Sequence, residues 1–436
     1  MKLVAIIISV LILSGCHTSG KLPMQSFEQK ITAALDTSSV LSTGFTGLVV
    51  YDLQENKIIF SRNASRYFVP ASNTKLFTLY ACMKTLGDSI PGLRYLETDT
   101  SLIFWGTGDP TLLHPYFSES KTMSFLKSKS KTKKLYYSDS QSSLQHYGTG
   151  WMWDDYNDYY QAELTPFPMF GNVILIRKDS SGLKISPEMT IDQMGKKSGI
   201  KQVRRMMENN HFDFPDGLDT MATFEQEVPY KNASKINIEI LEKILESKIT
   251  SISTRLSKET KTLYSIPTDT VYRRMMQVSD NMLAEHLLLL CGSTIGDSIS
   301  TKFSIDTMTA KYISDIPDKP AWVDGAGLSR YNLFTPMSIV TLLQKMYREY
   351  PEDKLFSLLA VGGGNGTLKH MFNAEQDAFI FAKSGSMSGV YNLSGYMITS
   401  SGKRLIFSFM NNNFNTSVSS VKKEVAQILT RIKALK

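Results

Sequence analysis

Cysteine is scarce in this chain: 3 of its 436 residues, too few to hold together a disulfide-framework protein. Histidine is scarce too, with 6 residues and no His-Glu-x-x-His spacing, so the sequence predicts neither a metal site nor any other cofactor. Neither sign of charge dominates, because 48 Lys and Arg face 41 Asp and Glu. A net charge of +7 does not demand nucleic acid, and none is expected as a partner. A hydrophobic content of 42% excludes a disordered or collagen-like chain.

No apolar run reaches the roughly 20 residues that a membrane-spanning helix needs. The run at residues 3–13 has the length of a signal-peptide core and leads into Leu-Ser-Gly-Cys, which is similar to a bacterial lipobox. This predicts a lipoprotein signal peptide over residues 1–15, acyl chains on Cys16 that anchor the protein to a membrane, and a tether over residues 16–24. The protein would then lie in the bacterial periplasm, with the inner or outer membrane undecided. An ordinary signal peptide that contains a cysteine is the alternative.

Strand and helix patterns at both ends of the mature chain flank a middle region of different sequence character. The ends predict a β-hairpin over residues 47–60, helices from Ser72, over 269–290, over 336–347 and over 421–435, and strands at 378–382, 390–399 and 405–411. We expect residues 25–95 and 263–436 to form one domain and residues 96–262 to form one or two inserted subdomains. Within the insertion, the Lys/Ser-rich stretch 118–134 is expected to be solvated.

Two cysteines remain in the soluble part, Cys82 and Cys291, each in an apolar helical context. Their burial as free thiols is the expectation, and a single disulfide bridge between them is the alternative.

The first chemical signal is Ser72-x-x-Lys75 at a predicted helix start. Residues three apart share a helix face, and unpaired N–H groups at a helix start stabilise a developing oxyanion. Lys75 can take the hydroxyl proton of Ser72 only if desolvation and a second cation lower its pKa. Several other Ser-x-x-Lys pairs in the chain, including Ser181 with Lys184, show that the spacing alone is weak.

A second signal is Ser279-Asp280-Asn281, between two helical stretches. Ser279 could carry a proton to a leaving amine. Asn281 could hold Lys75 through its carbonyl oxygen and a substrate amide through its NH₂ group. A simple helix N-cap explains the same residues equally well.

The third signal is Lys383-Ser384-Gly385-Ser386 on a predicted strand. An edge strand offers its backbone to an extended peptide, and Gly385 would leave room for the substrate. Lys383 would supply the second cation that lowers the pKa of Lys75. An exposed strand end with a routine lysine is the alternative.

In this order, Ser-x-x-Lys, Ser-x-Asn and Lys-Ser-Gly resemble the three motifs of the penicillin-recognising serine acyltransferases. The resemblance implies an α+β fold in which helices flank a β-lactamase/transpeptidase-like antiparallel sheet of five strands. The long gap between residues 72 and 279 is similar to that of the class C low-molecular-mass penicillin-binding proteins, which are D-alanyl-D-alanine carboxypeptidases and endopeptidases. Further matching stretches are 69–75, 108–112, 150–155, 324–330 and 366–368.

The resemblance also implies a role for each matching residue. Ser72 would be the acylated nucleophile and Lys75 its base, with Ser279, Asn281 and Lys383 completing the catalytic set. Backbone N–H groups of Ser72 and Ser386 would form the oxyanion hole, and the hydroxyls of Ser384 and Ser386 would meet the terminal carboxylate of the substrate. Gly385 belongs to the same substrate-binding strand. Asp155 would read the free amino end of diaminopimelate, although the neighbouring Asp154 is open to the same reading.

Three other features have modest expectations. Trp151 and Trp153 are expected to pack within the insertion, with a sugar platform as the alternative. His286 is expected to be a helical residue with satisfied partners. The glycine-rich segment 362–366 lacks the Gly-Lys-Ser/Thr ending of a phosphate loop, so we expect a loop near the cleft.

The predicted function is a penicillin-sensitive serine D-alanyl-D-alanine carboxypeptidase or endopeptidase that acts on peptidoglycan stem peptides and is inhibited covalently by β-lactams. A β-lactamase is one alternative, although the segment between Ser279 and Lys383 lacks a Glu-x-x-x-Asn. An inactive, lipid-anchored peptidoglycan-binding protein on the same fold is another.

Overall fold

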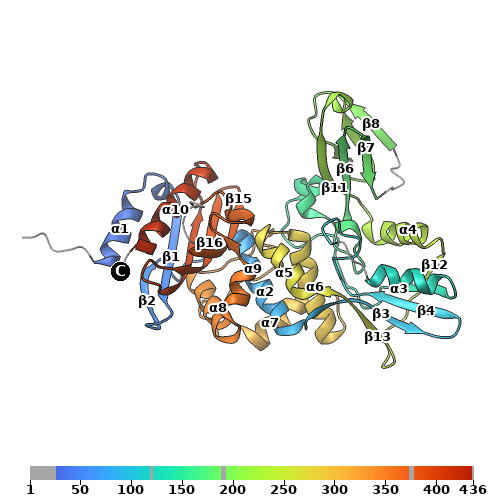
Figure 1. Cartoon of the computed structure of the whole chain (residues 1–436), viewed down its shortest axis with the longest axis horizontal. Helices are drawn as coiled ribbons and strands as arrows, with labels where there is room; N and C mark the ends of the chain where they lie inside the picture. Colours follow the sequence, from blue (N-terminus) through green and yellow to red (C-terminus); the bar gives the residue numbers. More distant parts are fainter. Residues whose placement is uncertain (1–25, 118–120, 188–192, 373–377, 435–436) are drawn as a thin grey trace, which may run out of the picture.

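The structure is a computed structural model that describes residues 26–117, 121–187, 193–372 and 378–434 (Figure 1). The predicted signal peptide, the tether and Cys16 lie outside these residues. Within the described ranges, every helix is too short or too polar to cross a membrane.

The main sheet joins the two ends of the chain. In the described part it has six antiparallel strands in the order β14-β15-β16-β17-β1-β2. They are β1 (Phe45–Asp52), β2 (Lys57–Arg62), β14 (Ala360–Val361), β15 (Ile380–Met387), β16 (Val390–Ile398) and β17 (Arg404–Asn412). The predicted hairpin is β1 and β2, and the three predicted C-terminal strands are β15 to β17. Five strands are long, as expected, and the two-residue β14 adds a short edge beside β15.

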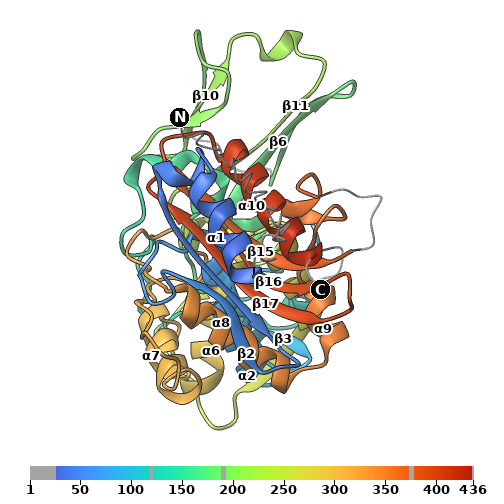
Figure 2. The same ribbon diagram turned by 90° about the vertical axis from the view of Figure 1, so that its left-hand side faces the viewer.

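Helices cover both faces of this sheet (Figures 1 and 2). One face carries the terminal helices α1 (Phe27–Thr37) and α10 (Val418–Ala434). The other faces a bundle of α2 (Lys75–Thr85), α5 (Thr268–Gln277), α6 (Asn281–Gly296), α7 (Thr301–Tyr312), α8 (Pro336–Glu349) and α9 (Glu352–Leu358). Helix α6 is the centre of the bundle, because its residues 282–293 are all buried, as expected of a helix that is apolar all round. The functional residues lie where this bundle meets β15.

The two cysteines whose burial was predicted lie next to each other inside this bundle. Cys82 on α2 and Cys291 on α6 are fully buried free thiols, with their sulfur atoms 3.7 Å apart. This agrees with the expectation of free thiols, and it shows how closely α2 and α6 pack.

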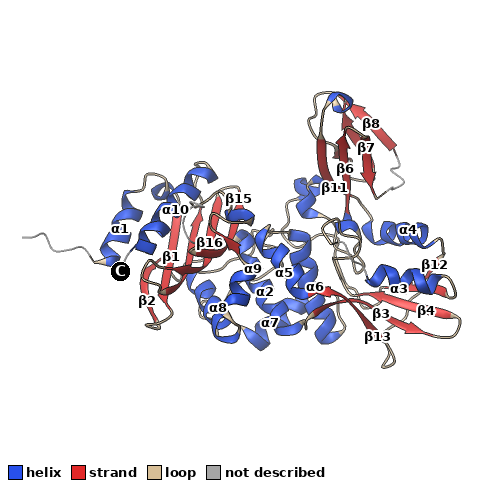
Figure 3. Ribbon diagram, in the orientation of Figure 1, coloured by secondary structure: helices blue, strands red, loops and turns tan. Residues whose placement is uncertain are grey.

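The insertion forms two groups of strands at the far side of the bundle (Figure 3). The first is a mixed five-stranded sheet in the order β12-β5-β4-β3-β13, packed with α3 (Lys121–Ser130) and α4 (Ala233–Leu245). Its strands are β3 (Ser89–Glu97), β4 (Ser101–Gly106), β5 (Lys134–Ser138), β12 (Ile249–Ser251) and β13 (Lys261–Pro267). Because β3 and β13 pair with each other, this sheet begins before residue 96 and ends after residue 262.

The second group projects away from the rest of the molecule (Figure 1). It contains two three-stranded sheets, β11-β6-β7 and β8-β10-β9. The strands are β6 (Val173–Asp179), β7 (Gly182–Ser186), β8 (Gln193–Lys197), β9 (Arg204–Arg205), β10 (His211–Pro215) and β11 (Phe224–Pro229).

Short 3₁₀ turns occur at Leu41–Thr43, Ala71–Thr74, Trp153–Asn157, Tyr159–Gln161, Phe170–Asn172, Leu218–Thr220 and Gly366–Leu368.

One expectation about the insertion was wrong. The Lys/Ser-rich stretch is not fully solvated, because α3 buries Thr122, Met123 and Leu126 against the five-stranded sheet. The lysines and serines occupy its outer face, so composition concealed an amphipathic helix.

Candidate active site

Ser72 lies in a tight turn rather than in the first turn of an α-helix. Residues Ala71–Thr74 form the 3₁₀ turn η2, and α2 begins only at Lys75. Ala71 has a φ angle of +46°, which is uncommon for a residue with a side chain. Such strained backbone persists only where the surroundings hold it, and here it directly precedes the predicted nucleophile.

The amine of Lys75 is fully buried and contacts three oxygens. Its Nζ lies 3.0 Å from Ser72 Oγ, 2.7 Å from Asn281 Oδ1 and 2.8 Å from the carbonyl oxygen of Ala326. A neutral amine can donate to the two carbonyl oxygens and accept from the hydroxyl, so this set fits a base directed at Ser72 Oγ. Burial lowers the pKa of Lys75 to about 8, although the carboxylates of Glu285, Asp324 and Asp280 oppose this shift.

The second motif lies in the break between α5 and α6. Asp280 is the N-cap of α6, where its carboxylate accepts from Leu283 N, and Asn281 is the first helical residue. Asn281 holds Lys75 through its carbonyl oxygen, as predicted. Its NH₂ group donates to the carbonyl oxygen of Tyr160 at 3.3 Å, a contact that was not predicted.

Ser279 has a φ angle of +68°. It is half-buried, and its hydroxyl has no hydrogen-bond partner within the described part of the chain. Its strained backbone and free hydroxyl beside Asn281 are typical of a residue that contacts a substrate, because the hydroxyl stabilises no part of the described fold.

Lys383 is fully buried on β15, where its Nζ donates to the carbonyl oxygen of Ser384 at 2.8 Å. Burial, and after it the nearby Lys75, hold the pKa of Lys383 well below its usual range. The prediction named desolvation and Lys383 together as causes of the lowered pKa of Lys75, and burial is the largest cause for both lysines. Repulsion between two buried amines is mutual, and it disfavours a charge on both at once.

Gly385 lies against the turn that holds Ser72, a contact that was not predicted. A Cβ atom there would lie 2.5 Å from Pro70 O and 2.9 Å from Ser72 N. The missing side chain therefore allows β15 to pack directly on the turn that holds the nucleophile. Of the two serines that flank Gly385, Ser386 is exposed and Ser384 is buried.

The glycine-rich segment 362–366, predicted to be a loop near the cleft, lies beside this strand, where Gly362 N donates to Ile380 O at 3.0 Å. It leads into the turn η7 (Gly366–Leu368), where Thr367 accepts a hydrogen bond from Ser384 Oγ at 2.7 Å. Residues 366–368 were a predicted matching stretch, but no role was predicted for Thr367. The contact places a further hydroxyl at the same end of the site as Ser384.

Two buried carboxylates behind Lys75 were missed from the sequence. Asp324 accepts from four donors, at 2.6–3.0 Å: Gly327 N, Ser329 N, Asn332 Nδ2 and Trp151 Nε1. Glu285 accepts from Gly325 N and Ala326 N. Both bind the loop whose Ala326 carbonyl holds Lys75. The signal for Asp324 was its place in the matching stretch 324–330, and that for Glu285 was its position one helical turn after Asn281.

The insertion reaches the site through its aromatic segment. Asp155 lies in the turn η3 (Trp153–Asn157), five residues before Tyr160, which Asn281 contacts. Asp155 is half-buried, and this partial burial raises its pKa, whereas Asp154 is exposed. Trp151 packs beside Tyr147 of the insertion, as expected, and also donates to Asp324 of the main domain. Trp153 is 71% exposed, so the expectation that it packs was wrong.

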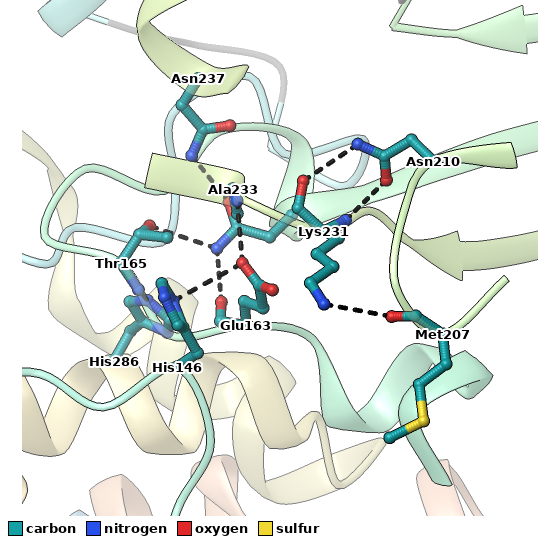
Figure 4. A network of polar contacts seen from close by, with 10 residues as sticks. His146, Glu163, Thr165, Met207, Asn210, Lys231, Ala233, Asn237 and His286 are labelled. Atoms are coloured by element: carbon teal, nitrogen blue, oxygen red, sulfur yellow. Dashed lines mark hydrogen bonds and ion pairs between the residues drawn. The ribbon is translucent and has the colours of Figure 1, made fainter. Parts of the chain in front are cut away.

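His286 has no free ring nitrogen for catalysis. Its Nδ1 lies 3.1 Å from Met282 O and its Nε2 accepts from Thr165 N at 3.4 Å. Burial lowers its pKa to about 4, which keeps it neutral. Figure 4 shows His286 beside Thr165 and Glu163, where it joins α6 to the insertion. In the described ranges, no group of three His, Cys, Asp or Glu side chains could hold a metal ion.

An antiparallel sheet flanked by helices, with a Ser-x-x-Lys pair between the bundle and an edge strand, is the arrangement of the serine acyltransferases that recognise penicillin. Residues 27–433 match the D-Ala-D-Ala carboxypeptidase 3 (S13) family. The chain belongs to this family.

Individual relatives agree with this assignment. The chain is 23% identical to the D-alanyl-D-alanine carboxypeptidase DacB of Haemophilus influenzae over 423 residues, which cover 85% of this chain and 86% of the relative. It resembles the crystal structure of penicillin binding protein 4 (dacB) from Haemophilus influenzae with a TM-score of 0.76 at 19% identity, over 93% and 99% of the two chains. A complex of that protein with a β-lactam gives a TM-score of 0.69 at 18% identity, with the same coverage.

Proposed function

We propose that this chain hydrolyses peptidoglycan peptides that end in D-alanyl-D-alanine, with Ser72 as the nucleophile and Lys75 as its base. One observation carries the proposal: a fully buried amine lies 3.0 Å from the hydroxyl of Ser72 and is fixed by two carbonyl oxygens. Lys75 takes the hydroxyl proton as Ser72 Oγ bonds to the carbonyl carbon between the two alanines.

The C–N bond then breaks, and the departing amine of D-alanine takes up a proton. Ser279 carries that proton from Lys75, because its strained backbone and free hydroxyl suit a transient contact. An ester to Ser72 remains, and water hydrolyses it to release the shortened peptide and the free serine. A β-lactam forms the same ester but keeps its leaving group attached, which explains covalent inhibition.

Strand β15 holds the substrate in this proposal. The N–H groups of Ser72 and Ser386 form the oxyanion hole, and Gly385 allows the close approach of the two segments that carry them. The hydroxyls of Ser384 and Ser386 meet the terminal carboxylate, and Thr367 orients Ser384. Lys383 adds positive charge at that end.

Cleavage of cross-linked peptides would follow the same path, with a diaminopimelate amine as the leaving group. Asp155 would bind the free amino end of diaminopimelate, which its place near Tyr160 supports. Acyl chains on Cys16 would hold the enzyme to a membrane in the periplasm, near its polymeric substrate.

The test is mass spectrometry of muropeptides after incubation with the enzyme. We expect loss of one alanine from pentapeptides, and conversion of cross-linked dimers to monomers if the enzyme is also an endopeptidase. Ser72→Ala should abolish both reactions. Ser181→Ala is the matched control, because Ser181 also precedes a lysine by three residues but lies at an exposed turn. Wild-type enzyme that leaves every muropeptide mass unchanged would contradict the proposal.

A further inference from the structure

Glu285 is a buried carboxylate that the proposed mechanism does not use. It lies on α6, one turn after Asn281, and is 2% exposed. Its two oxygens accept from consecutive backbone N–H groups: Oε1 from Ala326 at 2.7 Å and Oε2 from Gly325 at 3.1 Å. This paired contact fixes the orientation of both peptide groups, because each N–H direction is tied to a separate oxygen.

The same short segment holds Lys75 and Thr78 from its other side. The carbonyl oxygen of Ala326 accepts from Lys75 Nζ at 2.8 Å, and that of Gly325 accepts from Thr78 Oγ1 at 2.7 Å. The residues around it are packed too tightly for the segment to move freely. A Cβ on Gly325 would lie 2.6 Å from Ala284 O, and one on Gly327 would lie 1.9 Å from Ala71 O.

We propose that Glu285 is a positioning residue for the base: through the Gly325–Ala326 segment it directs the Lys75 amine at Ser72 Oγ. This rests on the proposed function, in which Lys75 activates Ser72. Helix α6 thereby fixes the base at two points, directly through Asn281 and indirectly through Glu285.

The charges around Glu285 define the expected pH effect. Two charged groups face Glu285: Lys75 on α2, and Asp324 in the loop that contains Gly325 and Ala326. Tyr147, Lys302 and Asp306 line the same cavity of about 350 Å³ as Glu285, and Lys302 and Asp306 are paired with each other at 2.6 Å. Burial raises the pKa of Glu285 to about 8, while the two N–H groups and Lys75 act against that rise. In its ionised form Glu285 attracts the ammonium of Lys75 and favours the protonated amine, so removing Glu285 should lower the pKa of Lys75.

The experiment measures the rate of acylation by a fluorescent penicillin from pH 6 to 9.5 in the full-length protein. Glu285→Gln keeps the shape of the side chain but removes the charge and sets an NH₂ group against a backbone N–H. Glu285→Asp keeps the charge but shortens the reach to the two N–H groups. Glu163→Gln is the matched control, because Glu163 is also 2% exposed and accepts a backbone N–H, that of Ala233 at 2.9 Å, outside the site (Figure 4).

We expect Glu285→Gln to lower the plateau rate about tenfold and to move the rising limb of the profile to lower pH by about half a unit. Glu285→Asp should lower the plateau and leave the limb in place, and Glu163→Gln should match the wild type in both. A Glu285→Gln profile with the limb at its wild-type position would overturn the proposal. If that variant does not fold, a wild-type plateau in Glu285→Asp would overturn it. Wild-type protein that is not acylated at any pH would instead refute the proposed function.

Discussion

Acylation of Ser72 should depend on pH through the protonation of Lys75. The hydroxyl can give up its proton only to a neutral amine, so the rate follows the neutral fraction of Lys75. With a pKa of about 8 in place of the usual 10.5, roughly a tenth of the molecules hold a neutral Lys75 at pH 7, and about half do so at pH 8. An unperturbed lysine would be neutral in fewer than about one molecule in a thousand at pH 7.

These fractions predict a rise of about fivefold in the acylation rate between pH 7 and pH 8, and a plateau above pH 9. The sign is fixed: a base gains activity as pH rises through its pKa. The assay is stopped-flow measurement of acylation by a fluorescent penicillin, with circular dichroism at each pH to show that the fold is kept. A rate that is constant from pH 6 to 9, or that falls over this range, would refute the assignment of Lys75 as the base.

Three substitutions test other parts of the site. Gly385→Ala should cost about 1–3 kcal/mol of unfolding free energy and most of the acylation rate, since its Cβ would lie 2.5 Å from Pro70 O. The control is Gly87→Ala, which should unfold in denaturant at nearly the wild-type midpoint because nothing lies within 4 Å of its Cβ. Equal unfolding midpoints for the two variants would contradict this prediction. Ser279→Gly should raise the unfolding free energy by about 1 kcal/mol, because glycine relieves the strain of the φ angle of +68°. The same variant should be acylated more slowly, because it lacks the hydroxyl. Unchanged acylation kinetics would exclude Ser279 from the proton path. Asn281→Ala should lower the acylation rate about a hundredfold because Lys75 loses its 2.7 Å partner, and a wild-type rate in this variant would show that the amine needs no such support.

Much of the main domain could be predicted because its elements are regular. The hairpin of β1 and β2 consists of two β-rich runs around a turn, the three C-terminal strands are short β-rich runs, and α10 has helical spacing. The break between α5 and α6 was also predictable, because Asp280 is a helix N-cap residue type. The motif residues could be placed on these elements, so the sequence alone indicates Ser72, Lys75, Asn281 and Lys383 as site residues.

Contacts between distant segments could not be predicted in the same way. Glu285 lies on an apolar helix, where its carboxylate gives no sign of the Ala326 N–H that it accepts. The reason for Gly385 is a close approach between β15 and the turn at Ser72, which no local pattern encodes. The many lysines and serines of helix α3 are typical of a solvated segment, and they concealed the helical spacing of Met123 and Leu126.

Peptide mass spectrometry after reaction with penicillin tests the central claim most directly. Trypsin cleavage after Arg66 and Lys75 yields the peptide 67–75, in which Ser72 is the only serine. One penicilloyl group per chain, located on Ser72 within this peptide and absent from Ser72→Ala, is the predicted result. An adduct on another residue, or folded protein that stays unmodified, would contradict the account.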